Sequence, residues 1–198
     1  MNTMTMPNPP AVRGVDGFEV ELACAARFDR SVLISGVDDD EDRGVAEAIH
    51  RRSRRAIAPF IAVNCARVSQ ACVESKLFGH APDRAGEIDR GCLELAHGGT
   101  IFLAKVDTIG FTLQGRLLEF LETGDIRRVG ESCIHRKVDV RVIASADNGP
   151  SAGWLARRLR EDLFYRLNII HLVVPFHRRN DRLYRQWLAT LRLQTVCA

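Results

Sequence analysis

The 198-residue sequence contains little lysine, no closely paired cysteines and no long apolar run. Lysine occurs three times against 25 arginines, an imbalance that we attribute to genomic base composition rather than to a binding need. No window approaches the ~18 apolar residues of a membrane-spanning helix. The opening MNTMTMPNPP has neither the basic start nor the apolar core of a signal peptide. These absences predict a soluble, cytoplasmic protein with no membrane partner.

The six cysteines show neither C-x-x-C spacing nor histidines at metal-ligand spacing. They are Cys24, Cys65, Cys72, Cys92, Cys133 and Cys197. Scattered cysteines in an intracellular chain favour reduced thiols that are mostly buried. The sequence therefore predicts neither a disulfide framework nor a metal site.

Charge is unevenly distributed along the chain, although the net charge is only +3. From Trp154 onward there are nine arginines against three acids, whereas the rest is slightly acidic. Nucleic-acid binding through this basic stretch is one hypothesis, but neither an aromatic platform nor a helix-turn-helix pattern accompanies it. An apolar content of 46% and a charged content of 27% are close to globular averages, so a single folded domain is expected.

Apolar runs alternate with amphipathic stretches after an N-terminal lead, residues 1–14, whose composition predicts disorder. Strands buried on both faces are predicted at SVLIS (31–35), FIAVN (60–64), TIFLA (100–104), VDVRVIASA (138–146) and IIHLVV (169–174). Helices are predicted at VAEAIHRRS (45–53), SQACVESKLF (69–78), FTLQGRLLEFLE (111–122) and LARRLREDLFYRL (155–167). A hairpin between RRVG (127–130) and KVDVRV (137–142) also fits the pattern. The alternation predicts an α/β fold with a mainly parallel five-strand core sheet.

Ligands of open parallel sheets bind outside the carboxyl ends of the strands, so chemistry is expected at 36–44, after Ala104 and after Ala146. A strand that ends at a glycine before a helix favours an anion, because free N–H groups and the helix dipole converge there. The first of these loops, GVDDDEDRG, instead has five acids among the seven residues between its glycines. Such a lining opposes the binding of an anion.

Five further segments follow one family's pattern, in the family's order. They are VESKLFGH (73–80), GCLELAHGGTIFL (91–103), LQGRLLEFLETGDIRRVG (113–130), VDVRVIA (138–144) and LREDLFYRLNII (159–170). The chain thus resembles, over residues 15–182, the AAA+ central domain of NtrC-like bacterial enhancer-binding proteins, which activate sigma-54 RNA polymerase. The resemblance implies a P-loop NTPase-like three-layer fold, with ATP and Mg²⁺ as ligands in the intact family. The family's helical lid and DNA-binding domain are missing, so residues 183–198 are interpreted as a C-terminal helix remnant.

In that family the acidic loop is a glycine-rich Walker A loop whose lysine contacts the β- and γ-phosphates. Aligned from Gly36, the lysine position falls on Asp42, and Arg43 follows it. The inner glycine positions fall on Asp39 and Glu41. Loss of glycine removes the backbone freedom that wraps a phosphate, and aspartate repels a phosphate. An alternative role for the acids is to cap the next helix.

The family's Walker B strand ends in Asp-Glu, which hold Mg²⁺ and orient the attacking water. Here these positions are Ala104 and Lys105, which supply neither a metal ligand nor a base. Lys105 either stays solvated or pairs with the acids of 38–42. The family's sensor asparagine aligns with Asp147, and Asn148 beside it would restore the amide after a one-residue shift.

Of two surface features of the family, this chain lacks one and has residues that resemble the other. The GAFTGA loop that contacts sigma-54 is replaced by APDRAGEIDR (81–90), a shorter charged connection, so direct sigma-54 contact is not expected. Arg160 and Arg166 resemble the family's arginine fingers, which act on the nucleotide of the neighbouring subunit. Their structural alternative is a salt bridge to Glu161 or Asp162.

These departures predict a degenerate, non-hydrolysing family member, a regulatory or interaction module rather than an enzyme, with no cofactor of its own. The implied partner is an intact AAA+ enhancer-binding protein or a second copy of the chain. Two other hypotheses stay open: the altered loop still binds ATP, or the chain is a decayed gene product without a role.

Overall fold

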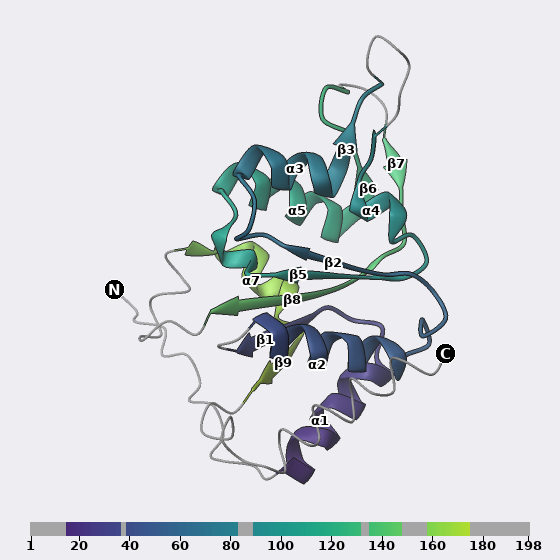
Figure 1. The fold of residues 1–198 in the computed structure, drawn as a ribbon, viewed down its shortest axis with the longest axis vertical. Helices are drawn as coiled ribbons and strands as arrows, with labels where there is room; N and C mark the ends of the chain where they lie inside the picture. Colours follow the sequence, from purple (N-terminus) through teal and green to yellow (C-terminus); the bar gives the residue numbers. More distant parts are fainter. Residues whose placement is uncertain (1–14, 37–38, 83–88, 132–134, 148–157, 175–198) are drawn as a thin grey trace.

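The structure is a computed structural model that describes residues 15–36, 39–82, 89–131, 135–147 and 158–174 (Figure 1). The N-terminal lead and the C-terminal helix remnant expected from the sequence lie outside these residues.

Five parallel strands form the central sheet, in the order β2-β5-β8-β1-β9. They are β1 (Val32–Gly36), β2 (Phe60–Asn64), β5 (Thr100–Ala104), β8 (Arg141–Asp147) and β9 (Ile170–Val173). All five apolar runs of the sequence become strands, which confirms the α/β fold with a parallel core sheet. All five residues of β5 are buried, as a central strand covered on both faces requires.

Helices cover both faces of this sheet, which gives three layers (Figure 1). They are α1 (Val15–Arg27), α2 (Asp39–Arg51), α3 (Gln70–Phe78), α4 (Cys92–Leu95), α5 (Phe111–Thr123) and α7 (Glu161–Leu167). One core cluster joins α3, α5 and α7 to the sheet, and a second joins α1 and α2 to its other face. Leu33 of β1 packs in the first cluster and Ile34 in the second, because successive strand residues face opposite sides.

Short hairpins and one 3-10 turn complete the described elements. β3 (Gly79–His80) pairs with β4 (Asp89–Arg90), and β6 (Asp125–Ile126) pairs with β7 (Arg136–Lys137). The 3-10 turn η1 (Val106–Thr108) follows β5. The second hairpin confirms the kind of element predicted at 127–142, but its first strand lies earlier, at Asp125–Ile126. Gly124 precedes that strand with φ of 73°, a left-handed conformation that ends α5 and turns the chain.

Two predicted helix boundaries were wrong. α2 begins at Asp39, so much of the supposed loop at 36–44 forms the first turns of a helix. Conversely, the helix predicted over 155–167 does not run through Arg160, which takes an extended conformation as the N-cap of α7. Acids stabilise the start of a helix through its dipole, and this explains the early start of α2.

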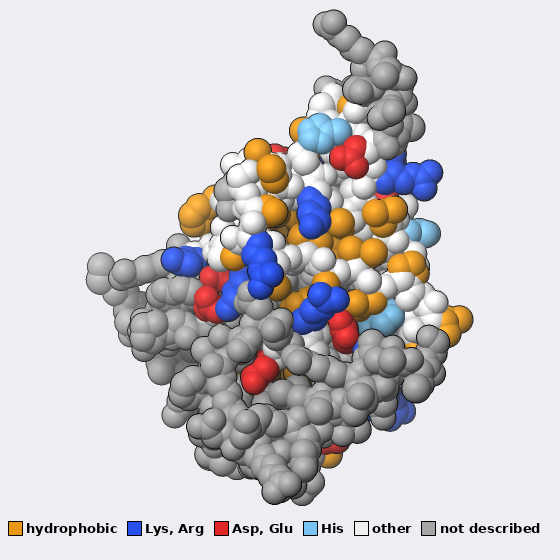
Figure 2. Space-filling view, viewed as in Figure 1, with side chains coloured by type: hydrophobic (Ala, Val, Ile, Leu, Met, Phe, Trp, Pro, Cys, Tyr) orange, Lys and Arg blue, Asp and Glu red, His pale blue; other side chains and the backbone are white. Residues whose placement is uncertain are grey.

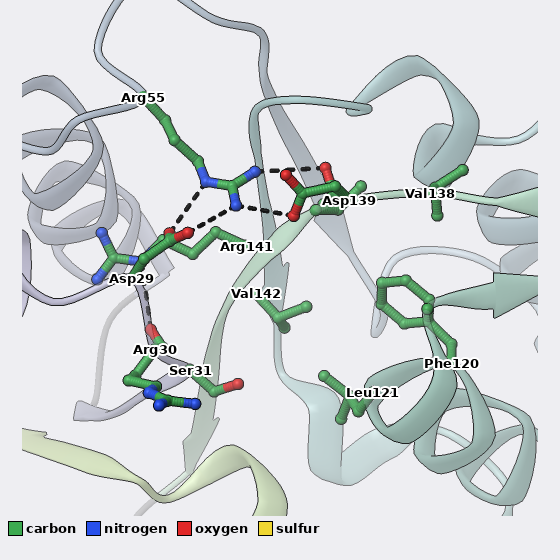
Figure 3. A pocket seen from close by; sticks show the side chains of 12 residues that line it. Asp29, Arg30, Ser31, Arg55, Phe120, Leu121, Val138, Asp139, Arg141 and Val142 are labelled. Atoms are coloured by element: carbon green, nitrogen blue, oxygen red, sulfur yellow. Dashed lines mark hydrogen bonds and ion pairs between the residues drawn. The ribbon is translucent and has the colours of Figure 1, made fainter.

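Arg55 ties the amino ends of the strands together (Figure 3). Its Nη2 donates to Asp29 at 2.6 Å and to Asp139 at 2.8 Å, and the hydrogen bond from Arg55 lowers the pKa of the Asp29 carboxyl. Arg141 lies beside this cluster and donates to the carbonyl of Ala25 at 2.6 Å. A cavity of about 210 Å³ opens here, at the edge of the sheet opposite the predicted ligand site. We interpret the cluster as structural, because each Arg55 nitrogen already has partners.

On the face in Figure 2, basic side chains are interspersed with apolar ones rather than gathered into one basic patch. Within the described part of the chain, no helix is long and apolar enough to cross a membrane. Four cysteines are described, and all four are free thiols. Cys65 is buried, which raises the pKa of its thiol to about 12, but Cys24 and Cys72 are exposed, so the expectation of mostly buried thiols was wrong.

Candidate functional site

The carboxyl ends of three adjacent strands bring the predicted site residues together. β8 lies between β5 and β1, and Gly36 of β1 is the register partner of Asp147 of β8. Ala104 ends β5 on the other side of β8. The positions taken as degenerate Walker A, Walker B and sensor positions therefore share one edge of the sheet, as parallel strands require. Asn148 lies outside the described residues.

Lys105 bridges two of these strand ends. Its Nζ forms an ion pair with the Oδ1 of Asp147, and its backbone N–H donates to the hydroxyl of Ser145 at 3.3 Å. The lysine side chain is only 13% exposed. A solvated Lys105 was therefore the wrong expectation, and one partner among the described residues is the sensor-position aspartate. Lys105 has φ 58° and ψ 48°, a left-handed conformation that is costly for any residue with a Cβ.

Asp107, which sequence reasoning did not single out, is a buried carboxylate directly behind this ion pair. Its Oδ1 accepts a hydrogen bond of 3.4 Å from the backbone N–H of Asp147, and its Oδ2 lies 3.7 Å from a guanidinium nitrogen of Arg158. Burial raises the pKa of the Asp107 carboxyl, although the hydrogen bond from Asp147 opposes this shift. An aspartate two residues after a buried strand, within the apolar turn VDTI, was the signal available in the sequence.

The acids of the first loop lie on α2. Asp42, which aligns with the phosphate-binding lysine, is 1% exposed and therefore faces the protein interior. Arg43 points the other way and donates to Glu47 at 2.9 Å, one helical turn later. Asp39 is the first residue of the helix, and Glu41 is partly buried. The alternative in which the acids serve the helix start agrees with these positions.

The chemistry available at this edge is that of an internal ion-pair cluster. Two ion pairs are described there, Lys105 with Asp147 and Arg158 with Asp107, and Asp42 is a buried carboxyl group on α2. Ala104, predicted from the resemblance to occupy the position of a metal-binding carboxylate, has only a methyl side chain. Among the described residues, no group of three or more His, Cys, Asp or Glu side chains is placed to hold a metal ion.

Of the two arginines predicted as finger-like, Arg160 is the N-cap of α7 and Arg166 lies in its last turn. Arg160 pairs with Asp162 at 2.8 Å, as the structural alternative predicted, and its side chain is 40% exposed. Arg166 instead donates to the backbone carbonyl of Leu121 on α5 at 3.1 Å. An open hollow of about 500 Å³ adjoins Arg160 and is lined also by Glu161, Asp162 and Tyr165.

The connection proposed to replace the sigma-54-contacting loop is described only at its ends. Gly79–His80 and Asp89–Arg90 pair as an antiparallel hairpin, and the centre of the connection lies outside the described residues. Gly79 and Gly91 allow the two sides of this hairpin to approach, since a Cβ at Gly91 would lie 2.4 Å from the carbonyl oxygen of Leu77.

The fold has three layers, a five-strand parallel sheet and a strand-to-helix turn at one central strand. These features define a P-loop NTPase-like α/β domain. Within that class the family can be stated. A model of the sigma-54 interaction domain matches residues 17–173, and the chain belongs to this family.

Curated relatives agree with this membership. The anaerobic nitric oxide reductase transcription regulator NorR of Escherichia fergusonii is 41% identical over 165 residues, which are 82% of this chain and 32% of that protein. NorR of Escherichia coli K12 is 40% identical over 166 residues, with the same coverage of 82% and 32%. The chain thus spans about a third of the length of these relatives, and it is homologous to sigma-54-dependent transcription regulators.

Similarities to solved structures agree with this family membership. NtrX from Brucella abortus superimposes with a TM-score of 0.75 and 32% identity, over 83% of this chain and 37% of NtrX. NtrX in complex with ATP gives a TM-score of 0.73 and 31% identity, over 86% and 39% of the two chains. The P-loop NTPase domain of a sigma-54 activator from Escherichia coli matches 79% of this chain and 99% of its own length. Its identity is 17% and its TM-score is 0.51, so this similarity supports the fold alone.

Proposed function

We propose that this chain is a non-hydrolysing regulatory module of the sigma-54-dependent transcription regulator family, which acts in the cytoplasm by docking on an intact relative or on itself. The observation that carries the proposal is the ion pair between Lys105 and Asp147. It joins two strand ends at the place where the intact family uses a Walker B glutamate and a sensor asparagine. The protein supplies both charges, so these two side chains neutralise each other without a metal or a nucleotide.

The phosphate side of the site supports the same proposal. Asp42 replaces the lysine that contacts the β- and γ-phosphates, so a carboxyl group stands where the intact family has a cation. Two unit charges 4 Å apart interact by about 4 kcal/mol at an effective dielectric of 20. Exchange of attraction for repulsion at such a contact weakens nucleotide binding by orders of magnitude. The residues present therefore do not fit a triphosphate in the family's manner.

The metal side does not fit Mg²⁺ either. Magnesium in nucleotide sites is bound through carboxylate and phosphate oxygens and water, whereas Ala104 offers a methyl group. Lys105 places a positive charge next to it, which opposes a divalent cation. ATP hydrolysis by this chain is accordingly not proposed.

The direct test is isothermal titration of the full chain with ATP·Mg²⁺ up to millimolar concentration. We expect no binding heat from the wild-type chain. A triple variant, Asp42→Lys with Ala104→Asp and Lys105→Glu, is expected to regain binding if the rest of the site is still shaped for nucleotide. A Kd below about 0.1 mM for the wild-type chain, roughly 5.5 kcal/mol of binding free energy, would establish the alternative of an ATP-binding regulator.

The docking surface that we propose is the exposed side of α7. Arg160, Tyr165 and Asp162 border the hollow, and Tyr165 is 52% exposed. Phe111 at the start of α5 is 61% exposed, and the Arg160 guanidinium lies against Gly115 one turn further along that helix. Exposed aromatic residues and arginine are enriched in protein interfaces. An arginine finger acts in trans, so this surface needs no nucleotide in its own subunit.

A mixing experiment tests the docking. An intact enhancer-binding protein is combined with this chain, and its ATPase rate and oligomer mass are measured. We expect both to change, and Arg160→Ala together with Arg166→Ala to abolish the change. Asp162→Asn releases Arg160 from its internal partner and is expected to strengthen the effect. Arg67→Ala, at an exposed arginine elsewhere, is the matched control. No change in rate or mass on mixing would overturn the proposed docking.

The hypothesis of a decayed gene product has a separate measurement. Two core clusters of buried residues support a stably folded domain. A cooperative urea transition is therefore expected, whereas a chain without one would favour decay.

A further inference from the structure

Helix α1 presents an apolar stripe to solvent in addition to the side that it buries. Its buried side belongs to the second core cluster through Phe18 and Leu22. The α1 stripe comprises Val20, Ala23, Cys24, Arg27 and, directly after the helix, Phe28, all of them exposed. This spacing of three and four residues places them on one helical face. Val20 is 69% exposed and Phe28 52% exposed, an arrangement that the fold itself does not require.

A basic groove runs along this stripe. The basic groove has a volume of about 360 Å³ and is lined by Ala23, Ala26, Arg27, Arg52, Ser53 and Arg54. Glu19 of α1 neutralises Arg52 with an N–O distance of 2.6 Å. Among the described residues, Arg27 and Arg54 have no carboxylate within ion-pair distance. Asp29 interacts electrostatically with Arg54, so the positive charge that Arg27 and Arg54 give the groove is compensated only in part.

Ile57 is a further exposed apolar residue. It lies in the same turn as Arg54 and is fully exposed, at 103% of its reference area. Large apolar side chains that are exposed near one another and rimmed by charge mark interaction sites. Helical ligands bind such surfaces by laying apolar residues at three- and four-residue spacing into a groove.

We propose that the α1 stripe and the basic groove together dock an acidic amphipathic helix of another protein. The apolar face of that helix covers Val20 and Phe28, and its acidic flank pairs with Arg27 and Arg54. Charge complementarity identifies the occupant, because the groove contributes net positive charge beside an apolar stripe. The proposal is independent of the nucleotide site and of α7.

The undescribed ends of this chain are poor occupants on charge grounds. Residues 1–14 contain no Asp or Glu, and residues 175–198 contain one acid against five arginines. A second copy docked through the same face would bring Arg27 and Arg54 against like charges. Nucleic acid would satisfy the arginines but would leave the apolar side chains of Val20 and Phe28 without partners. A protein helix satisfies both halves of the surface.

The test is fluorescence anisotropy of the full chain with a labelled synthetic helix of about five turns, leucine on one face and glutamate elsewhere, in each of its leucine registers. The same peptide with lysine in place of glutamate and a labelled single-stranded DNA serve as competing probes. We expect micromolar binding of at least one acidic register, and at least tenfold weaker binding of the other two probes.

Two sets of variants assign the binding to this surface. Arg27→Glu with Arg54→Glu is expected to weaken the acidic peptide by about tenfold, as the reversal of two exposed charge pairs implies. Phe28→Ser is expected to weaken it similarly without a change in charge. Arg67→Glu with Arg90→Glu makes the same charge change at exposed positions elsewhere and is expected to leave binding within about twofold.

Several results would overturn the proposal. Absence of binding in every acidic register, equal binding of the lysine peptide, or tighter binding of DNA would each do so. If the two double charge reversals weakened binding equally, the binding would depend only on the net charge of the chain and not on this surface. Circular dichroism of each variant checks that the chain is folded, so that lost binding is not mistaken for lost structure.

Discussion

Substitution of Lys105 separates the two opposing contributions of this residue to stability. The ion pair of Lys105 with Asp147 stabilises the folded state, whereas the left-handed backbone conformation of Lys105 destabilises it. Lys105→Ala removes the ion pair and keeps the backbone cost, whereas Lys105→Gly removes both. A comparison of the two variants therefore isolates the backbone contribution.

The magnitudes follow from the surroundings of the pair. Exposed ion pairs contribute about 0.2–1 kcal/mol, and this pair should lie near the upper limit because the Lys105 side chain is only 13% exposed while Asp147 is 40% exposed. Lys105→Ala is therefore expected to lower the free energy of unfolding by about 1 kcal/mol. Relief of the left-handed conformation returns about 1 kcal/mol, so Lys105→Gly should be close to wild type.

The assay is urea denaturation followed by circular dichroism, with a double-mutant cycle through Asp147→Ala. We expect a coupling energy of about 1 kcal/mol between the two side chains, which falls in 1 M NaCl because the Debye length shrinks to about 3 Å. Lys76→Ala, at an exposed lysine on α3, is the control and should change stability by less than about 0.5 kcal/mol. A coupling below about 0.3 kcal/mol, or equal stability of the alanine and glycine variants at position 105, would refute the reasoning.

Three further predictions concern the scaffold, each measured by the free energy of unfolding. Arg55→Ala removes hydrogen bonds to two carboxylates and should cost about 2 kcal/mol, whereas Arg54→Ala nearby should stay within about 0.5 kcal/mol. Gly99→Ala would place a Cβ 2.0 Å from a carbonyl oxygen and should cost at least about 2 kcal/mol of stability. Gly44→Ala on α2, where a Cβ would have nothing within 4 Å, should stabilise the fold by about 0.5–1 kcal/mol. The opposite order of the two variants would contradict the packing. Burial lowers the pKa of His50, so the unfolded chain binds the proton more tightly and the stability of the fold decreases as pH drops below about 6.5. His50→Gln should reduce that loss of stability between pH 7 and pH 5. An unchanged pH profile in this variant would show that other groups cause the loss.

The fold could be predicted well because its signals are local. Short runs rich in β-branched residues, such as FIAVN at 60–64, became strands with the predicted bounds. Ser69 was the first residue of a predicted helix and caps α3, where its hydroxyl accepts a hydrogen bond from the N–H of Cys72. Failures occurred at boundaries, where competing local preferences decide. The acids after Gly36 were assigned to a loop by analogy with a glycine-rich motif, although acids favour the start of a helix, which begins at Asp39.

The site could be predicted in position but not in its contacts. Three strand ends were expected to meet, and Gly36 and Asp147 are register partners. The ion pair of Lys105 with Asp147 was not predicted, because it depends on which strand lies next to β5. The burial of Asp107 and its approach to Arg158, 51 residues later, depend on the same packing.

The sequence by itself determined that this chain has a parallel α/β core, and it predicted a ligand edge after three particular strands and the substitution of the family's phosphate-binding lysine and Walker B acids. Periodicity, side-chain shape and aligned motifs carry that information over short stretches of chain. Only the tertiary structure decided how the substituted residues are used. Strand order and register set Lys105 against Asp147 across 42 residues of sequence, where the largely buried lysine pairs with a carboxylate that is 40% exposed.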